Sequence, residues 1–259
     1  MMTAAFATLG IDAVYLAIDV TPEHVRDAVQ GLVQLGAVGA NVTVPHKRAA
    51  LRCCDELDSS AAAIGAVNTL SFERGRVIGH NTDAGGAVDA LRSAGVDLAG
   101  KRVAVLGNGG AARAVAIGLT DAGTAHIAIC ARRDDDVLAA ALRARGATCD
   151  SVRLDDAHDA IANADVIVQA TSAGFGDAID DDRIIAPLQA ARHGTWTMDL
   201  VYSPRETRWL RAARQLGLRP IDGLGMLASQ AARALSIWFH VDVQPDILRG
   251  FLDAPDPHG

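Results

Sequence analysis

Lysine is nearly absent from this chain of 259 residues, in which Lys47 and Lys101 stand against 22 arginines. An arginine keeps its proton near neutral pH, whereas a partly desolvated lysine amine can release one. A lysine in this sequence is therefore a candidate for proton chemistry that arginine cannot perform. Lys47 is the stronger candidate because it ends a polar-tipped segment of β type, residues 41–47 (NVTVPHK).

Aromatic residues are also scarce, at 4% of a chain that is 50% hydrophobic, which favours an α/β protein packed with Ala, Val and Leu. The 24 basic and 31 acidic residues give a net charge of −7, so nothing attracts nucleic acid or anionic membrane in general. No apolar run approaches the roughly 18 residues of a membrane span, and the N-terminus lacks the pattern of a signal peptide. We therefore expect neither nucleic acid nor membrane as a partner.

The four cysteines, Cys53, Cys54, Cys130 and Cys149, show no metal-ligand spacing. Two of them are adjacent in the chain, where they are poor disulfide partners. These features predict no metal site and a cytoplasmic location, in which thiols stay reduced.

Alternating helix and strand patterns predict an α/β fold with two domains. The first domain, residues 1–84 plus 225–259, begins with a short helix over 1–9 and an alternating strand over 12–20, and contains a hairpin around Arg74-Gly75. The second domain, residues 85–224, is predicted to be a doubly wound parallel sheet of the Rossmann type. The final helices, from Gly225 onward, are expected to return to the first domain.

The second domain opens with a buried-type strand followed at once by Gly107-Asn108-Gly109-Gly110-Ala111-Ala112. In a glycine motif between strand and helix, the first glycine makes a tight turn and the second lets a pyrophosphate approach the backbone. The following helix offers free amides and the positive end of its dipole. The pattern predicts a dinucleotide site.

Arg132 and Arg133 stand at the end of the next strand, where an NAD site usually has Asp or Glu. Two guanidinium groups suit a 2′-phosphate, so we predict NADP as the cofactor. The alternative is that both arginines are surface charges paired with Asp134, Asp135 and Asp136.

Six motifs together resemble the shikimate dehydrogenase family over nearly the whole chain: NVTVPHK (41–47), GAVNTL (65–70), NTDAGG (81–86), GNGGAAR (107–113), ATSAG (170–174) and DGLGMLASQAA (222–232). The resemblance implies NADP-linked, reversible reduction of 3-dehydroshikimate to shikimate, in the biosynthesis of chorismate and aromatic amino acids. It also implies an active site between a substrate domain and a Rossmann domain, in a monomer or homodimer. Quinate or aminoshikimate dehydrogenase, or a catalytically weak NADP-binding or regulatory relative, remain the alternatives.

On the matching positions, the resemblance makes Lys47 and Asp83 the catalytic pair. The substrate residues would be Thr43, Asn68, Asp83, Tyr202 and Gln230. The cofactor residues would be Gly107, Asn108, Gly109, Gly110, Ala111, Arg132, Arg133, Thr171, Gly223 and Met226. Taken singly, Asp83 is better explained as a helix N-cap and Asn68 as a turn former. The sequence does not decide whether Lys47 or Asp83 moves the proton.

The chain departs from the family pattern at its start, where the usual first strand and its Ser-x-Ser-Pro loop have no counterpart. Without those serines we expect weaker binding of a substrate carboxylate, by about 10²- to 10⁴-fold. Either the sequence starts at an internal methionine, which we favour, or the protein is a diverged relative. Asp136 also stands where family members often have a further basic residue for the cofactor phosphate.

Overall fold

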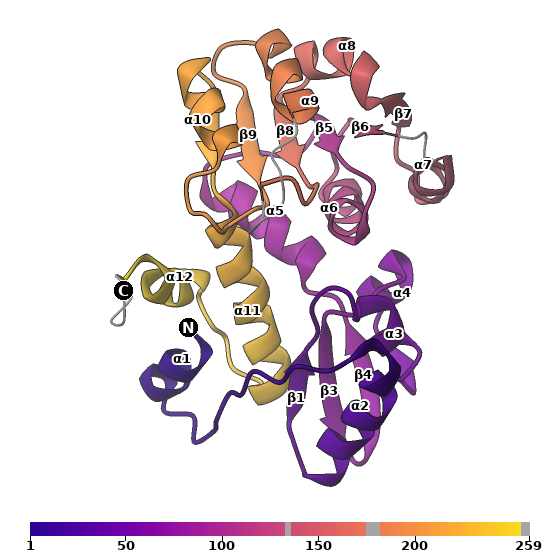
Figure 1. Cartoon of the computed structure of the whole chain (residues 1–259), viewed down its shortest axis with the longest axis vertical. Helices are drawn as coiled ribbons and strands as arrows, with labels where there is room; N and C mark the ends of the chain where they lie inside the picture. The colour runs from indigo at the N-terminus through magenta and orange to yellow at the C-terminus, as the bar shows by residue number, and fades with distance from the viewer. Residues whose placement is uncertain (133–135, 175–181, 255–259) are drawn as a thin grey trace. The chain divides into compact units, whose positions relative to one another are not determined.

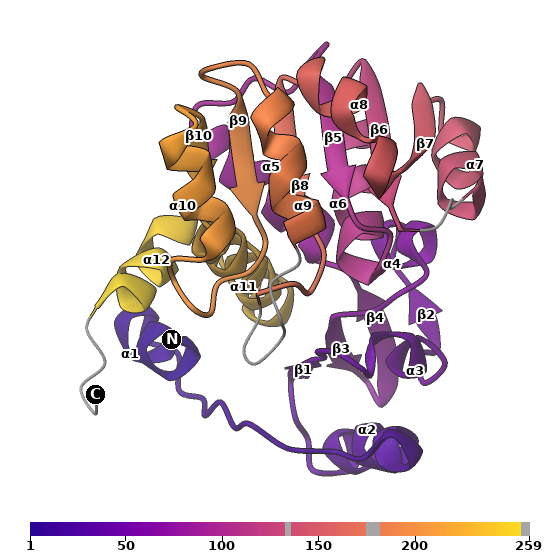
Figure 2. The same cartoon turned by 45° about the horizontal axis from the view of Figure 1, so that its top comes forward.

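The computed structural model describes residues 1–132, 136–174 and 182–254. The chain divides into two compact units: unit 1 is Met1–Gly86 with Leu227–Gly259, and unit 2 is Ala87–Met226. The boundaries fall inside α5 (Asp83–Ser93) and α11 (Gly223–Phe239), so each of these helices contributes residues to both units (Figures 1 and 2). Each unit has its own sheet, and the predicted α/β class is confirmed.

Unit 1 is built on a four-stranded sheet in the order β1-β3-β4-β2. The strands are β1 (Gly39–Asn41), β2 (Glu56–Leu57), β3 (Thr69–Glu73) and β4 (Arg76–His80). The predicted hairpin joins β3 to β4, with Arg74 and Gly75 both at positive φ in its turn. Its register places Thr69 opposite His80, so the chain leaves the hairpin next to the segment that precedes β3.

The helices of unit 1 lie around this sheet and along α11. They are α1 (Met2–Leu9), the 3-10 turn Pro22–His24, α2 (Val25–Gln34), α3 (Lys47–Leu51), α4 (Ser59–Ile64) and α12 (Pro245–Asp253). One apolar cluster joins α1, α11 and α12. Trp238 of α11 donates its indole N–H to the carbonyl oxygen of Leu70, at 2.9 Å. A Cβ on Gly39 would lie 2.1 Å from that indole nitrogen, so only glycine lets the helix pack this closely on β1.

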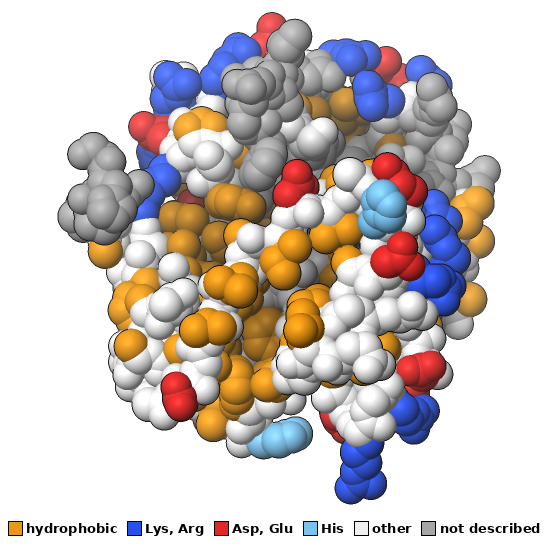
Figure 3. All heavy atoms as spheres, turned by 60° about the horizontal axis from the view of Figure 1, so that its bottom comes forward, with side chains coloured by type: hydrophobic (Ala, Val, Ile, Leu, Met, Phe, Trp, Pro, Cys, Tyr) orange, Lys and Arg blue, Asp and Glu red, His pale blue; other side chains and the backbone are white. Residues whose placement is uncertain are grey.

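The strand predicted over residues 12–20 is absent. Residues 11–20 form no ladder with any described strand, although Val14, Leu16 and Ile18 alternate as a strand would. These three side chains are 79%, 71% and 61% exposed. Figure 3, in which the lower part of Figure 1 comes forward, shows apolar side chains gathered on the side that faces the viewer. Alternation gives a segment one apolar face, but a strand also needs a neighbouring strand with which to exchange hydrogen bonds.

Unit 2 contains a six-stranded sheet, parallel throughout, in the order β10-β9-β8-β5-β6-β7. Its strands are β5 (Arg102–Leu106), β6 (His126–Ala131), β7 (Cys149–Arg153), β8 (Val166–Gln169), β9 (Trp196–Asp199) and β10 (Arg219–Ile221). The strand order reverses between β5 and β8. In sheets of this kind the carboxyl ends of the strands at that reversal form the ligand crevice.

Both faces of this sheet are covered, because the β5 residues are buried on both sides from Val103 to Leu106. The helices of unit 2 outside α5 and α11 are α6 (Gly110–Asp121), α7 (Asp136–Ala144), α8 (His158–Ala162), α9 (Asp182–Ile185) and α10 (Arg208–Gln215), with 3-10 turns at Leu154–Asp156 and Ala186–Ala190. One face packs on α8, α9 and α10, where Trp209 is 2% exposed (Figure 2). Of the helices described, none is both long and apolar enough to cross a bilayer.

Candidate functional site

Lys47 and Asp83 are brought together in unit 1. Lys47 opens α3, and Asp83 is the first residue of α5, 36 positions later in the chain. The Lys47 Nζ donates to the Asp83 Oδ2 at 2.6 Å. The Asp83 side chain is 6% exposed and the Lys47 side chain 23%, so the carboxylate is buried while the amine still reaches solvent. The pair therefore offers a proton-carrying amine held by a fixed carboxylate.

Asn68 supports this pair from the loop before β3. Its Nδ2 donates to the second oxygen of Asp83, at 2.8 Å, and its Oδ1 accepts from the backbone N–H of Thr82, also at 2.8 Å. Thr69 donates its hydroxyl to the same Oδ1 at 3.0 Å. Asn68 therefore does more than form a turn, because its buried amide holds the segment that carries Asp83.

The contacts of Asp83 also exclude the alternative that its carboxylate serves only as a helix cap. The backbone N–H of Asp83 donates to the Oδ1 of Asn81 at 3.0 Å, so the side chain of Asn81 forms an Asx turn that leads into α5. Both carboxylate oxygens of Asp83 are left for Lys47 and Asn68.

Two further candidate substrate residues belong to unit 1. Gln230 lies in α11, and its Oε1 accepts from the Nδ2 of Asn68 at 3.3 Å, which connects the helix to the Lys47–Asp83 pair. Thr43 lies exposed in the segment between β1 and α3, four residues before Lys47. The structure therefore gathers Lys47, Asn68, Asp83 and Gln230 by direct contacts, and places Thr43 beside them in the chain.

The candidate cofactor residues belong to unit 2, at the carboxyl ends of its strands. Gly107 follows β5 directly and has φ +110°, which only glycine adopts without strain. A Cβ there would lie 3.1 Å from the carbonyl oxygen of Ala170 and from the Cγ2 of Thr171, so the loop after β5 runs against the loop after β8. These are the two neighbouring strands at which the strand order reverses.

The start of α6 is open toward this edge. Gly109 is the N-cap, it makes no side-chain cap hydrogen bond, and both Gly109 and Gly110 are exposed. A Cβ added to either would meet nothing within 4 Å. Asn108 is exposed and Ala111 partly buried. Free amides, a dipole end and open space fit a pyrophosphate, so this loop fits the dinucleotide that the glycine pattern predicts.

Arg132 is exposed immediately after β6, the strand next to β5 in the sheet. It therefore stands at the edge where a ribose 2′-phosphate would be recognised. Arg133, Asp134 and Asp135 lie outside the described residues, as does the side chain of Asp136. The alternative prediction, in which the two arginines pair with these aspartates, therefore also lies outside the described residues.

Four remaining candidates follow β8, β9 and β10. Thr171 donates its backbone N–H to the Oε1 of Gln169, at 2.5 Å. Gly223 begins α11, and a Cβ there would lie 2.8 Å from the carbonyl oxygen of Leu200. Met226 is buried at 8% exposure, one turn into the helix. Tyr202, a predicted substrate residue, is 37% exposed in the loop after β9.

Sequence reasoning missed two sets of residues around the Lys47–Asp83 pair. Tyr15 donates its hydroxyl to the Oδ1 of Asn41 at 2.9 Å, and burial raises the pKa of this phenol. The second set surrounds His80 and Asp58, 22 residues apart in the chain. The short pattern Asp58-x-Ser60 before a helix was a visible capping signal, but nothing in it indicates His80 as a partner.

Comparison with protein families gives two matches along the chain. The family model described as the shikimate dehydrogenase substrate binding domain matches residues 1–70, which carry Lys47 and Asn68. The model described as shikimate / quinate 5-dehydrogenase matches residues 89–207, which carry the Gly107 loop and Arg132.

Curated relatives match over nearly the whole chain. The shikimate dehydrogenase (NADP(+)) of Moorella thermoacetica is 44% identical, over 92% of this chain and 82% of the relative. That of Methanopyrus kandleri is 40% identical, over 96% of this chain and 88% of the relative. Among solved structures, shikimate 5-dehydrogenase from Listeria monocytogenes in complex with shikimate and NAD has a TM-score of 0.89 at 31% identity, over 97% of this chain and 90% of that one.

Proposed function

The chain belongs to the shikimate dehydrogenase family, and from this premise we propose that it catalyses the reversible, NADP-dependent reduction of 3-dehydroshikimate to shikimate. The family resemblance predicted from the six motifs is confirmed. The observation that carries the proposal is the 2.6 Å contact between the Lys47 Nζ and the Asp83 Oδ2, because it joins an amine that can donate a proton to a carboxylate that can orient it.

Reduction of a ketone by hydride leaves an alkoxide, so the site must supply a proton and a positive charge beside that oxygen. An ammonium group does both, and general acid–base help of this kind contributes about 10²- to 10⁴-fold. Asp83 accepts a hydrogen bond from one of the three ammonium hydrogens of Lys47. This bond orients the amine and leaves the other two hydrogens for substrate. We assign the proton transfer to the pair.

The substrate is a polyhydroxylated ring with a carboxylate, which amide and hydroxyl groups suit. We propose that Thr43, Asn68, Asp83, Tyr202 and Gln230 contact it. Within this set, the buried amide of Asn68 fixes Asp83 and Gln230 together, through contacts of 2.8 and 3.3 Å. Such cross-bracing favours one arrangement of the polar groups over many.

NADPH, when bound, supplies the hydride. We propose that the amides from Gly107 to Ala111 hold its pyrophosphate and that Arg132 binds its 2′-phosphate, with Arg133 as a second candidate outside the described residues. Thr171, Gly223 and Met226 follow β8 and β10 and would line the nicotinamide side. The exposure of Arg132 directly after β6 supports NADP over NAD.

Relatives named shikimate dehydrogenase favour shikimate over quinate or aminoshikimate, and favour an enzyme over a catalytically weak relative. We further propose a cytoplasmic location and a monomeric or homodimeric state, to be checked by fractionation and by light scattering.

The test is a turnover assay with the purified chain, following the absorbance of the reduced nicotinamide. We expect oxidation of shikimate with NADP⁺ to exceed oxidation of quinate with NADP⁺, and shikimate with NAD⁺, each by at least about tenfold. A kcat in the ordinary enzyme range, about 1 to 10³ s⁻¹, would support catalysis. NADPH binding without any turnover would contradict the proposal and identify a binding module.

A further inference from the structure

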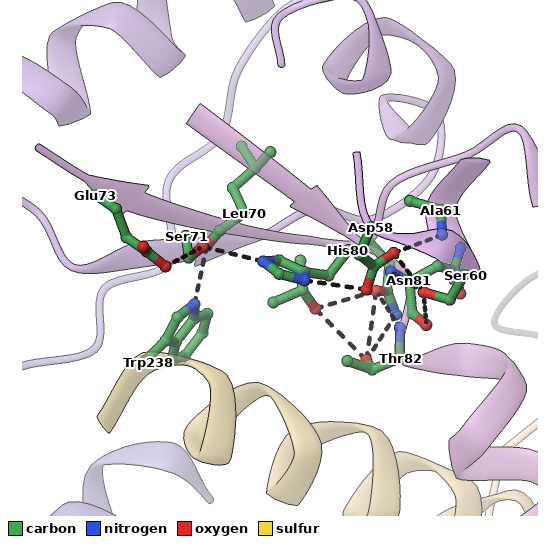
Figure 4. Close-up of polar contacts among 12 residues, drawn as sticks. Asp58, Ser60, Ala61, Leu70, Ser71, Glu73, His80, Asn81, Thr82 and Trp238 are labelled. Carbon is green, nitrogen blue, oxygen red and sulfur yellow. Dashed lines mark hydrogen bonds and ion pairs between the residues drawn. The ribbon is translucent and has the colours of Figure 1, made fainter. Parts of the chain in front are cut away.

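A second polar network of unit 1 centres on His80, the last residue of β4. The Nδ1 of its ring lies 3.1 Å from the Oδ2 of Asp58, and the Nε2 lies 3.0 Å from the Oγ of Ser71. Figure 4 shows the ring between these two neighbours, with Ser71 on one side and Asp58 on the other. The His80 side chain is 15% exposed, so most of it is withdrawn from water.

Asp58 is an acceptor in this network. It caps α4, taking hydrogen bonds from the backbone N–H of Ala61 and the hydroxyl of Ser60, both at 2.7 Å. Burial raises the pKa of this carboxyl, but the hydrogen bonds from His80, Ala61 and Ser60 outweigh burial and hold the pKa below its usual value. Because an ionised carboxylate can only accept, the hydrogen between Asp58 and the ring sits on the Nδ1 of His80.

Ser60 carries the network to the chain that leads into Asp83. Its Oγ accepts from the backbone N–H of Asn81 at 3.1 Å and lies at the same distance from the carbonyl oxygen of Asn81. The side chain of Asn81 in turn donates to the carbonyl oxygen of Ala66 at 2.9 Å and accepts from the N–H of Asp83 at 3.0 Å. Every contact from the imidazole to the backbone of Asp83 is thus a hydrogen bond.

We propose that His80 is a positioning residue for Asp83, acting through Asp58, Ser60 and Asn81. This inference rests on the proposed function, because it presupposes that the Lys47–Asp83 pair moves the proton. Releasing Asp58 from the ring frees the carboxylate that orients Ser60, and the backbone of Asn81 loses a fixed neighbour. A displacement of about 1 Å at a reacting group can cost about 10²-fold in rate, so a small shift of Asp83 is sufficient to affect turnover.

Asparagine and glutamine separate the two sides of the ring. The side-chain nitrogen of asparagine is as many bonds from Cα as the Nδ1 of histidine, and that of glutamine as many as the Nε2. His80→Asn can therefore keep the bond to Asp58, whereas His80→Gln can keep only the one to Ser71. Ser71→Ala is the matched control, because it removes the partner on the side that leads away from Asp83.

We expect His80→Asn and Ser71→Ala to keep kcat within about threefold, and His80→Gln to lower it about 10- to 100-fold, with the KM for NADPH unchanged in all three. Ser60→Ala leaves the ring intact and breaks the path one step later, so it should lower kcat as His80→Gln does. Amide hydrogen exchange of the full chain gives a readout without turnover. Exchange at Asn81 and Asp83 should accelerate at least about tenfold in His80→Gln and Ser60→Ala, and not in His80→Asn.

Equal kcat and equal exchange in His80→Gln and His80→Asn would overturn the positioning role, as would a Ser60→Ala chain that behaves like wild type. If His80→Gln does not fold, as judged by thermal melting, Ser60→Ala alone decides between these results. If the wild-type chain shows no turnover but the variants still show the expected exchange pattern, the proposed function is contradicted. The positioning of Asp83 by His80 is then still supported.

Discussion

Replacing Lys47 by methionine removes the ammonium group and keeps most of the side-chain volume. Because the proposed proton donor is lost, kcat should fall about 10²- to 10⁴-fold, equivalent to about 3 to 5 kcal/mol in the barrier. The affinity for NADPH should stay within about threefold, since the candidate cofactor residues all belong to unit 2 while Lys47 belongs to unit 1. Steady-state kinetics and a fluorescence titration of NADPH measure the two quantities.

Stability should fall as well, because the Asp83 carboxylate, with its side chain 6% exposed, loses the cation at 2.6 Å. Breaking a fully buried pair costs about 3 to 5 kcal/mol and an exposed one about 1 kcal/mol or less. The Lys47 side chain is 23% exposed, which places the expected loss between these limits, at about 1 to 3 kcal/mol. Adding Asp83→Asn removes the stranded charge, so the double variant should be more stable than Lys47→Met alone.

The chain offers its own control in Lys101, the other of its two lysines, which stands just before β5. Lys101→Met should leave kcat and NADPH affinity unchanged. A Lys47→Met enzyme within tenfold of the wild-type kcat, or one whose NADPH affinity falls more than tenfold, would refute the assignment of Lys47 to proton transfer.

Gly107→Ala should raise the KM for NADPH at least about tenfold and cost about 1 to 3 kcal/mol of stability, because of its φ of +110° and the 3.1 Å contact with Ala170. Gly109→Ala meets nothing within 4 Å, so calorimetry should find a loss of at most about 1 kcal/mol, from alanine at an N-cap, while its KM for NADPH still rises. Arg132→Ala should reduce the preference for NADPH over NADH about 10- to 100-fold in competing turnover assays, and an unchanged ratio would contradict its role at the 2′-phosphate. The folded-state pKa of Asp58 is lowered, so its charge stabilises the fold above the unfolded pKa near 4 and stops doing so as pH falls through the folded value. Urea titrations of Asp58→Asn should therefore show a deficit at pH 7 that disappears in acid; a deficit independent of pH would point to the cap geometry instead.

The parallel sheet of unit 2 was predictable because its signals are local. The strand ending at Leu106, the glycine loop after it and the helix to Asp121 follow one another without interruption. In unit 1 the prediction of a strand over 12–20 was wrong, since periodicity reports which faces are apolar and says nothing of whether a neighbouring strand is present. β10 was missed because Arg219–Ile221 is a short edge strand that includes a proline.

The residues of the candidate site likewise divide into those that the sequence indicated and those that it did not. Arginine cannot replace a lysine as proton donor, so the scarcity of lysine narrows the candidates to Lys47 and Lys101, and the segment 41–47 favours Lys47. The contacts of His80 had no such signal, because Asp58 and Ser71 lie 22 and 9 positions away in sequence and meet it only through strand register. Residues whose chemistry is unusual are visible in a sequence, whereas residues that hold them in place become visible only through contacts.

Asn68 shows why the holding residues are constrained as tightly as the pair they hold. Its Nδ2 faces the Asp83 carboxylate and its Oδ1 faces the backbone N–H of Thr82, so the position requires a donor and an acceptor on one short side chain. An aspartate would set two carboxylates against each other, and a leucine would leave the Asp83 Oδ1 and the Thr82 N–H buried without a partner, at about 1 to 3 kcal/mol each. Among the residues that the structure describes, no buried side-chain nitrogen or oxygen lacks a hydrogen-bond partner. The carboxylate beside Lys47 is therefore fixed before any substrate arrives, and it need not reorganise as charge develops on the substrate.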